Sequence, residues 1–364
     1  MTAGDGRRGG MEGARVWTIT IGDLKLRRRQ FVIAMVGASL VFAMALVLAG
    51  MSNSFREEVR TTVGDVGADE WVVTAGSSGP ITGFSALPSG ALDQLQHTPG
   101  VRAADPLIVI PQAAQTADGL HSVYVIAYRR GGLGTPTTTH GRVVRAPAEA
   151  VADSRLGVGP GQVITMSGRS FTVVGTTEGH SVFGGLPIVY VDLTDGQELS
   201  FGGQPQATAV VLRGVPESVP DGLSVLSNAA VRSDALRTMH SAVKSIDSTQ
   251  LLMWIVAAVI VAGLVYVSAL ERGKDFAVLK AMGASTGSVF LSMALEAVLV
   301  CLVAVVLAGI IATLIRPFFA LPVSIPVAAF VTLPIIGLAV GLVGSLAGLR
   351  RAVTADPARA FGGT

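Results

Sequence analysis

Four apolar segments constrain this chain more than any other feature of its sequence. Each reaches the ~20 residues that an α-helix needs to cross the hydrocarbon core of a bilayer. The segments are residues 31–51, 251–270, 289–315 and 327–349. Only 14% of the 364 residues are charged, which is too few for an ordinary soluble protein of this length. The sequence therefore predicts a membrane protein with four transmembrane helices.

The first apolar segment also has some features of a secretory signal. Arg27–Arg29 resemble a charged n-region, and Leu48–Gly50 resemble the start of a lipidation site. Met51 occupies the position where lipidation requires cysteine, and the apolar run is longer than the core of a typical signal peptide. We therefore expect the segment to remain in place as a transmembrane helix.

Basic residues are concentrated next to the apolar segments on one side, whereas the short loop between the third and fourth segments carries only Arg316. On that side they include Arg15, Lys25, Arg27, Arg28, Arg29, Arg272, Lys274, Lys280, Arg350, Arg351 and Arg359. Because cytoplasmic loops carry the excess of Lys and Arg, this distribution predicts which segments lie inside and which outside. Inside we expect a tail with an interfacial helix, a connector and a second tail, at residues 1–30, 271–288 and 350–364. Outside we expect residues 52–250 and the short loop 316–326. The net charge of +2 gives no indication of nucleic-acid binding.

The large outer region has the pattern of a compact α+β domain. Seven short runs are rich in β-branched or aromatic residues and are bounded by Gly, Pro or polar turns. We expect these strands at Trp71–Thr74, Leu107–Ile110, Ser122–Tyr128, Val163–Met166, Phe171–Val174, Ile188–Val191 and Ala209–Leu212. A helix is expected over Ser89–Leu95.

Two amphipathic stalk helices are expected to carry this domain. Each has apolar residues at helical spacing, and these are Phe55, Val59, Val63 and Val66 in the first stalk and Leu236, Met239, Val243 and Ile246 in the second. The second pattern predicts a helix that runs from about Arg232 into the membrane without a break. We expect the stalks to pack together; the alternative is an unrelated pair of surface helices.

The connector between the second and third apolar segments is a candidate docking element. Its apolar residues recur every three positions while its charged residues point elsewhere, which suits a short helix with one apolar face. The apolar residues are Phe276, Leu279 and Met282, and the charged residues are Lys274, Asp275 and Lys280. Gly283 fits the left-handed residue that ends such a helix. The residues alone leave two interpretations open, an ordinary cytoplasmic loop and a helix that docks on a partner.

Three further features lie within the apolar segments. Glu296 sits about two turns into the third segment, where a carboxylate has either a functional role or a structural pairing near the connector. Small residues at four-residue spacing in the fourth segment favour close helix packing, within one subunit or between subunits. These are Gly337, Gly341, Gly344 and Gly348. The single cysteine, Cys301, excludes an intrachain disulfide.

Catalytic and cofactor motifs are absent from the sequence. No phosphate-binding GxxxxGK[ST] loop occurs, so ATP would have to be bound by another polypeptide. The five histidines lack metal-ligand spacing, and these are His97, His121, His140, His180 and His240. Residues 179–184 come close to a nucleophile elbow, but the second glycine is displaced and we interpret the stretch as a loop. The sequence therefore predicts no catalytic, cofactor or metal site.

The connector and several outer segments resemble the MacB/FtsX-like permeases of ABC transporters. The family connector, approximately ER-x-x-E-I-G-x-L-K-A-[LM]-G-A-S, is matched at Glu271, Arg272 and Leu279 to Ser285, while Asp275 and Phe276-Ala277 depart from it. Glu296 falls where the family often has a glutamate, and residues 356–361 are similar to its closing D-P-A-x-A-L. In the outer region, residues 156–163 and 171–175 are similar to L-G-L-x-x-G-D-x-V and F-x-V-V-G.

The resemblance implies the role of a non-catalytic permease subunit in a bacterial cytoplasmic membrane. The connector would be a coupling helix that docks on a separate ATPase, which binds the ATP and Mg²⁺, and two permease copies or close homologues would pair with two ATPases. The docking residues would be Glu271, Arg272, Lys274, Asp275, Phe276, Leu279, Lys280, Met282 and Gly283.

The same resemblance leaves the task of the outer domain open. One expectation is export or extraction of an amphiphile such as a lipid, lipoprotein or peptide, aided by membrane lipids or an outer adaptor. The alternative is an FtsX-like regulator of cell-wall hydrolases, or a sensor, with nothing transported.

Overall fold

The structure, a computed structural model, describes residues 28–83, 85–87, 89–271, 286–319, 323–332, 335–336 and 339. These divide into two compact units. The first, Met1–Met51 together with Ser245–Thr364, is here called the membrane unit, and the second, Ser52–Lys244, the sheet domain.

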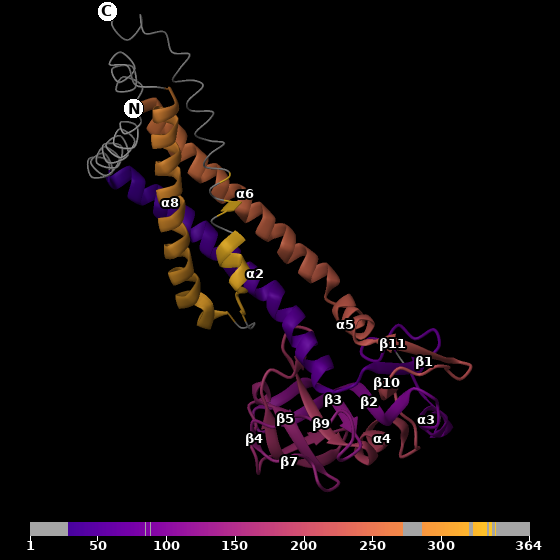
Figure 1. Cartoon of the computed structure of the whole chain (residues 1–364). Helices are drawn as coiled ribbons and strands as arrows, with labels where there is room; N and C mark the ends of the chain where they lie inside the picture. Colours follow the sequence, from indigo (N-terminus) through magenta and orange to yellow (C-terminus); the bar gives the residue numbers. More distant parts are fainter. Residues whose placement is uncertain are drawn as a thin grey trace, which may run out of the picture. The chain divides into compact units, whose positions relative to one another are not determined.

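Long helices make up the membrane unit. The long helices are α2 (Arg28–Asp65), α6 (His240–Glu271) and α8 (Thr286–Ile315), and parts of α2 and α6 extend into the sheet domain (Figure 1). The short helix η2 (Arg316–Phe318) follows α8. Three stretches among the described residues are long and apolar enough to span a bilayer, namely Met35–Asp65, His240–Gly263 and Val298–Ile315. Most of the predicted fourth span, 327–349, lies outside the described residues, so the number four stays a prediction.

Small side chains bring α2, α6 and α8 close together. Ala38 of α2, Ala257 of α6 and Ala304 and Ala308 of α8 are buried in one apolar cluster. At Gly50 the approach is closer still, because an added Cβ would lie 2.6 Å from Val323 Cγ1. Outward-facing Val, Leu and Ile side chains on the same helices are exposed, as a lipid environment requires.

The sheet domain contains eleven strands in one sheet. Their bounds are β1 (Glu70–Thr74), β2 (Val101–Thr116), β3 (Gly119–Tyr128), β4 (His140–Gly141), β5 (Glu149–Asp153), β6 (Val163–Met166), β7 (Arg169–Thr177), β8 (Ser181–Val182), β9 (Leu186–Asp192), β10 (Ala209–Gly214) and β11 (Leu223–Ser227). The order is β11-β1-β10-β2-β3-β9-β5-β7-β4, and β8 pairs with β9. β6 pairs with both β2 and β7, so the strands β2-β3-β9-β5-β7-β6 close into a barrel.

Alternating apolar residues fill the barrel, as the two-residue period of a strand requires. In the register, Ile108 lies opposite Ala127, Ala127 opposite Val191, and Ile164 opposite Phe171, and all are buried. The helix α4 (Leu193–Phe201) packs Leu193, Leu199 and Phe201 against this interior. The barrel is therefore a packed core and not a ligand channel.

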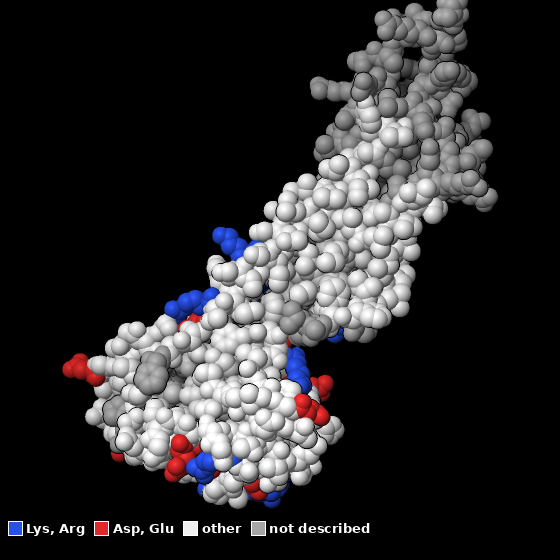
Figure 2. Space-filling model, turned by 180° about the vertical axis from the view of Figure 1, so that it is seen from behind, with Lys and Arg blue, Asp and Glu red and all other residues white. Residues whose placement is uncertain are grey.

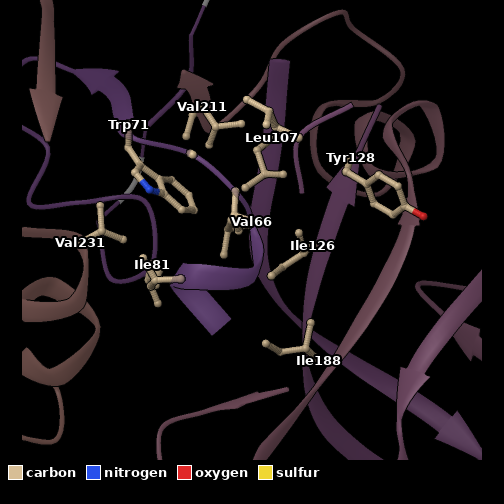
Figure 3. Close-up of a cluster of buried hydrophobic side chains, with 14 of the residues drawn as sticks. Val66, Trp71, Ile81, Leu107, Ile126, Tyr128, Ile188, Val211 and Val231 are labelled. Carbon is tan, nitrogen blue, oxygen red and sulfur yellow. The ribbon is translucent and has the colours of Figure 1, made fainter. Parts of the chain in front are cut away.

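Outside the barrel, β10, β1 and β11 extend the sheet and are covered on both faces. On one face, α3 (Ser89–Gln96) packs Ala91 and Leu95 against Val72 of β1 and Leu212 of β10. On the other, α2 and α5 (Asn228–Arg237) contribute to a large apolar cluster. Figure 3 shows Val66, the residue directly after α2, among Trp71, Ile81 and Ile126 in this cluster.

The α+β class, the predicted strands and the first stalk are confirmed. All seven predicted strands lie within observed strands, and the helix predicted from Ser89 is α3. Phe55, Val59 and Val63 are buried along α2, and Val66 is buried directly after its end. β4, β5, β8, β11, α4 and the first turn of α5 were not predicted. The second stalk is not one helix, because α5 ends at Arg237 and α6 begins at His240. The prediction of an unbroken helix was wrong, and Leu236 alone of its apolar positions packs against the large cluster.

Candidate functional site

The predicted coupling segment lies almost wholly outside the described residues. Glu271 is the last residue of α6, and α8 begins at Thr286. Arg272, Lys274, Asp275, Phe276, Leu279, Lys280, Met282 and Gly283 fall between them, outside the described part of the chain. Glu296 lies within α8, but its side chain is not described, and Gly337, Gly341, Gly344 and Gly348 are likewise outside. The docking, coupling and packing roles of these residues stay predictions.

Within the sheet domain, one face of α2 is bound to the barrel by a row of specific contacts. The α2 residues recur at spacings of three, four and three, so they follow a single line along the helix. We call this set of contacts the stalk clasp, and its members are Phe55, Glu58, Thr62 and Asp65 on α2 and Arg155, His180, Ser181 and Gly184 on the barrel.

The ion pair of the stalk clasp joins Glu58 to Arg155. Arg155 Nη1 lies 3.0 Å from Glu58 Oε1, and the same nitrogen donates to Ser181 Oγ. Arg155 belongs to the helical turn η1 (Ser154–Leu156), which Asp153 caps by accepting a hydrogen bond from the Arg155 amide at 3.0 Å. Burial raises the pKa of the Asp153 carboxyl. The side chain of Glu58 is 6% exposed, so its charge depends on Arg155 for compensation.

His180 forms the second polar contact of the clasp. Its Nε2 lies 2.7 Å from Asp65 Oδ2, its Nδ1 lies 2.7 Å from the Tyr190 hydroxyl, and its backbone N–H donates to Asp153 Oδ2 at 2.8 Å. Burial raises the pKa of Tyr190, which keeps its hydroxyl protonated. Because a carboxylate only accepts, Nε2 of His180 is the donor to Asp65.

The loop between β7 and β9 completes the clasp by lying directly on α2. Thr62 Oγ1 donates to the Ser181 carbonyl at 3.1 Å. An added Cβ on Gly184 would lie 2.5 Å from Phe55 Cε1, and Gly184 has a φ of +79°. Glycine is therefore required there by both the contact and the backbone. Phe183, with a φ of +52°, packs its ring against Tyr124 at 5.2 Å between centroids.

A separate set of contacts holds α5 to the sheet. The buried carboxylate of Asp234 accepts from the amides of Ile81 and Thr82 at 3.2 and 3.1 Å and from Arg237 at 3.0 Å. Trp71 Nε1 donates to Asn228 Oδ1 at 2.8 Å. The end of α2 and the helix α5, which lead from the sheet domain towards the membrane spans, are thus both fixed on the sheet domain.

These contacts hold α2 and α5 on the sheet domain. Among the described residues, no group of three or more His, Cys, Asp and Glu side chains is placed to hold a metal ion. The clasp instead fixes the register of α2, since a slide by one turn would separate Glu58 from Arg155 and Asp65 from His180 together. Such a slip would be costly because it would leave the buried carboxylate of Glu58 without its cation.

Only the α2 side of the clasp can be recognised in the sequence. The polar line of Glu58, Thr62 and Asp65 is visible beside the apolar positions of the first stalk. Its partners Arg155 and His180 lie roughly one hundred residues away in sequence, and no periodicity connects them. His180 was expected to be an isolated loop residue.

Comparisons with known proteins agree with the fold. Residues 31–234 match the family model of the MacB-like periplasmic core domain, and residues 249–357 match the FtsX-like permease C-terminal model. An ABC transporter permease of Mycobacterium bovis is 40% identical over 341 residues, which is 94% of this chain and 98% of that protein. Another from Mycobacterium tuberculosis is 37% identical over the same shares of the two chains.

Solved extracytoplasmic domains are more distant. The extracellular domain of the ABC-type transporter YknZ from Gram-positive bacteria has 12% identity and a TM-score of 0.34, covering 44% of this chain and 100% of that one. The periplasmic region of MacB from Actinobacillus actinomycetemcomitans has 10% identity and the same TM-score, covering 50% and 97%. The assignment rests on the family models and on the mycobacterial relatives. This chain belongs to the MacB/FtsX-like family of ABC transporter permeases.

Proposed function

We propose that this permease transmits the motion of a separate ATPase in the cytoplasm through α2 to the sheet domain on the outer side, where the motion exports or extracts an amphiphile. The observation that carries the proposal is the continuity of α2. One helix of 38 residues contains a candidate membrane span and ends in the stalk clasp. A displacement of the span is therefore passed along the helix axis to the barrel.

The energy source in this proposal is a partner chain. The sequence contains no phosphate-binding loop, whereas ABC transporters use ATP. We propose that the ATPase, in a dimer, docks on residues 271–288, and that a second permease copy or close homologue completes the complex. This places both termini in the cytoplasm of a bacterial cell and the sheet domain outside.

Co-purification tests the docking step. Leu279→Glu or Lys280→Glu should abolish recovery of the ATPase with the tagged permease, because each change puts a negative charge on the docking helix. Arg359→Glu, in the cytoplasmic tail, is the matched control and should leave recovery unchanged. Normal recovery with both connector variants would reject the docking assignment.

The character of the described surfaces supports an amphiphile as the cargo. On the face seen in Figure 2, the charges of the sheet domain are of both signs and interspersed, with no single-sign patch to attract a charged solute. The reconstituted complex should hydrolyse ATP faster with lipids or lipopeptides. Stimulation by an outer protein partner alone would favour a regulatory complex instead.

A further inference from the structure

The two connections between the sheet domain and the membrane spans differ in their local structure. On the outward path α2 is helical at every residue from Arg28 to Asp65. On the return path the helix is interrupted between α5 and α6 at Thr238–Met239. The Met239 amide there bonds to the Leu236 carbonyl three residues back, at 3.1 Å, in place of the α-helical partner four residues back. Such 3₁₀ geometry within a helical run commonly marks a hinge.

The side chains of α2 are also held more firmly than those at the break between α5 and α6. Phe55, Glu58 and Thr62 of α2 are buried, at 4%, 6% and 3% exposure, and each has a partner in the barrel. Beyond the last fixed turn of α5, Thr238, His240 and Ser241 are exposed and Met239 is half-buried. Bending α2 would therefore break the buried Glu58–Arg155 ion pair and buried hydrogen bonds, whereas bending at Thr238–Met239 would break few contacts.

We infer that the sheet domain is attached by one rigid connection and one hinge: α2 and the barrel move as a single body through the stalk clasp, and the chain bends at Thr238–Met239 where it returns to the membrane. Motion of α2 then sets the orientation of the barrel, and α6 accommodates the change. The use of this arrangement to transmit force rests on the proposed function; the rigid joint and the hinge do not.

Distance measurements between spin labels test the inference on the full-length protein without any ATPase. The labels are placed in a Cys301→Ala background, because Cys301 is the only cysteine. One pair, Arg60→Cys with Thr172→Cys, reports α2 against the barrel. The other, Ser241→Cys with Thr172→Cys, reports α6 against the barrel. The second distance distribution should be at least about twofold wider than the first. Equal widths, or a wider first distribution, would overturn the inference.

A clasp variant links the rigidity to the named contacts. Arg155→Ala should widen the first distribution to that of the second pair, because it removes the partner of Glu58. Arg169→Ala is the matched control, since Arg169 is also a barrel arginine paired with acids, Asp195 and Glu198, but lies outside the clasp. An unchanged width in Arg155→Ala would show that the clasp does not hold α2.

Hydrogen exchange of the unmodified protein covers the case in which Arg155→Ala does not fold. Amides of residues 56–65 should exchange as slowly as those of β3, and amides of residues 239–244 at least tenfold faster. Exchange at 56–65 as fast as at 239–244 would contradict the rigid joint. Because these measurements need neither ATP nor cargo, their failure is distinct from failure of the proposed function.

Discussion

Glu58 and Arg155 form an ion pair whose members are unequally buried, at 6% and 31% exposure. Arg155→Ala leaves a buried carboxylate without its cation, so it should lower the free energy of unfolding by about 3 kcal/mol. Glu58→Gln leaves an arginine that still reaches solvent and Ser181, and should cost about 1 kcal/mol. Chemical denaturation of the full-length protein in detergent, followed by near-ultraviolet circular dichroism, measures both.

The exposed pair on the same helix provides the control. Arg60 and Glu57 are 64% and 46% exposed, so Arg60→Ala should leave the stability nearly unchanged. If Arg155→Ala were as mild as Arg60→Ala, the clasp would contribute no more than a surface ion pair.

Gly196 illustrates a steric constraint on the barrel. An added Cβ would lie 2.1 Å from the Cβ of Ala127 on β3, so Gly196→Ala should push α4 off the barrel and destabilise the protein by about 1–3 kcal/mol. Gly64→Ala, at an open position of α2, should instead stabilise it by roughly 0.5–1 kcal/mol. Thermal melting of both variants gives the comparison, and a drop in both would contradict the steric account.

The ionisation of Glu149 should make the stability of the folded protein depend on pH. Arg142 holds it with two hydrogen bonds, at 2.7 and 2.6 Å, and this lowers the pKa of Glu149 from 4.5 to about 2. A lowered pKa means that the charged form favours the folded state, so the contribution is present above pH 4.5 and is lost as the pH falls towards 2. Glu149→Gln should therefore melt below the wild type at pH 7 and converge with it as the pH approaches 2. A constant difference would exclude this cause.

At the scale of single elements, β-branched residues made the central strands predictable. The ends of those strands depend on pairing with neighbouring strands, which composition does not show. The predicted strand Leu107–Ile110 is bounded by prolines on both sides, yet the observed β2 continues through both Pro106 and Pro111. A strand tolerates proline where the ladder does not need its N–H. β5, with the sequence EAVAD, lacks the usual composition and is a strand because β7 and β9 pair with it on either side.

Helix interruption is a second property that sequence periodicity misses. Leu236, Met239, Val243 and Ile246 keep an apolar spacing across the break between α5 and α6. A single 3₁₀ turn also places residues three apart on one side, so the pattern survives the change in hydrogen bonding. The first stalk was predicted correctly because its pattern and its helix both continue to Asp65.

For the whole molecule, the predicted orientation has a direct test in intact cells. In the Cys301→Ala background, Ser122→Cys on the exposed wall of the barrel should react with a membrane-impermeant maleimide. Ser285→Cys, in the predicted cytoplasmic connector, should react only after the cells are permeabilised. Labelling of Ser285→Cys in intact cells would reverse the orientation inferred from the basic residues.

The closed barrel has a consequence for how such proteins diversify. All six of its strands come from one uninterrupted stretch, Val101–Asp192, while β1, β10 and β11 flank that stretch in the chain. A single recombination event at each end would exchange the whole barrel and leave the membrane helices intact. The incoming barrel would still need equivalents of Arg155 and His180 to seat on α2.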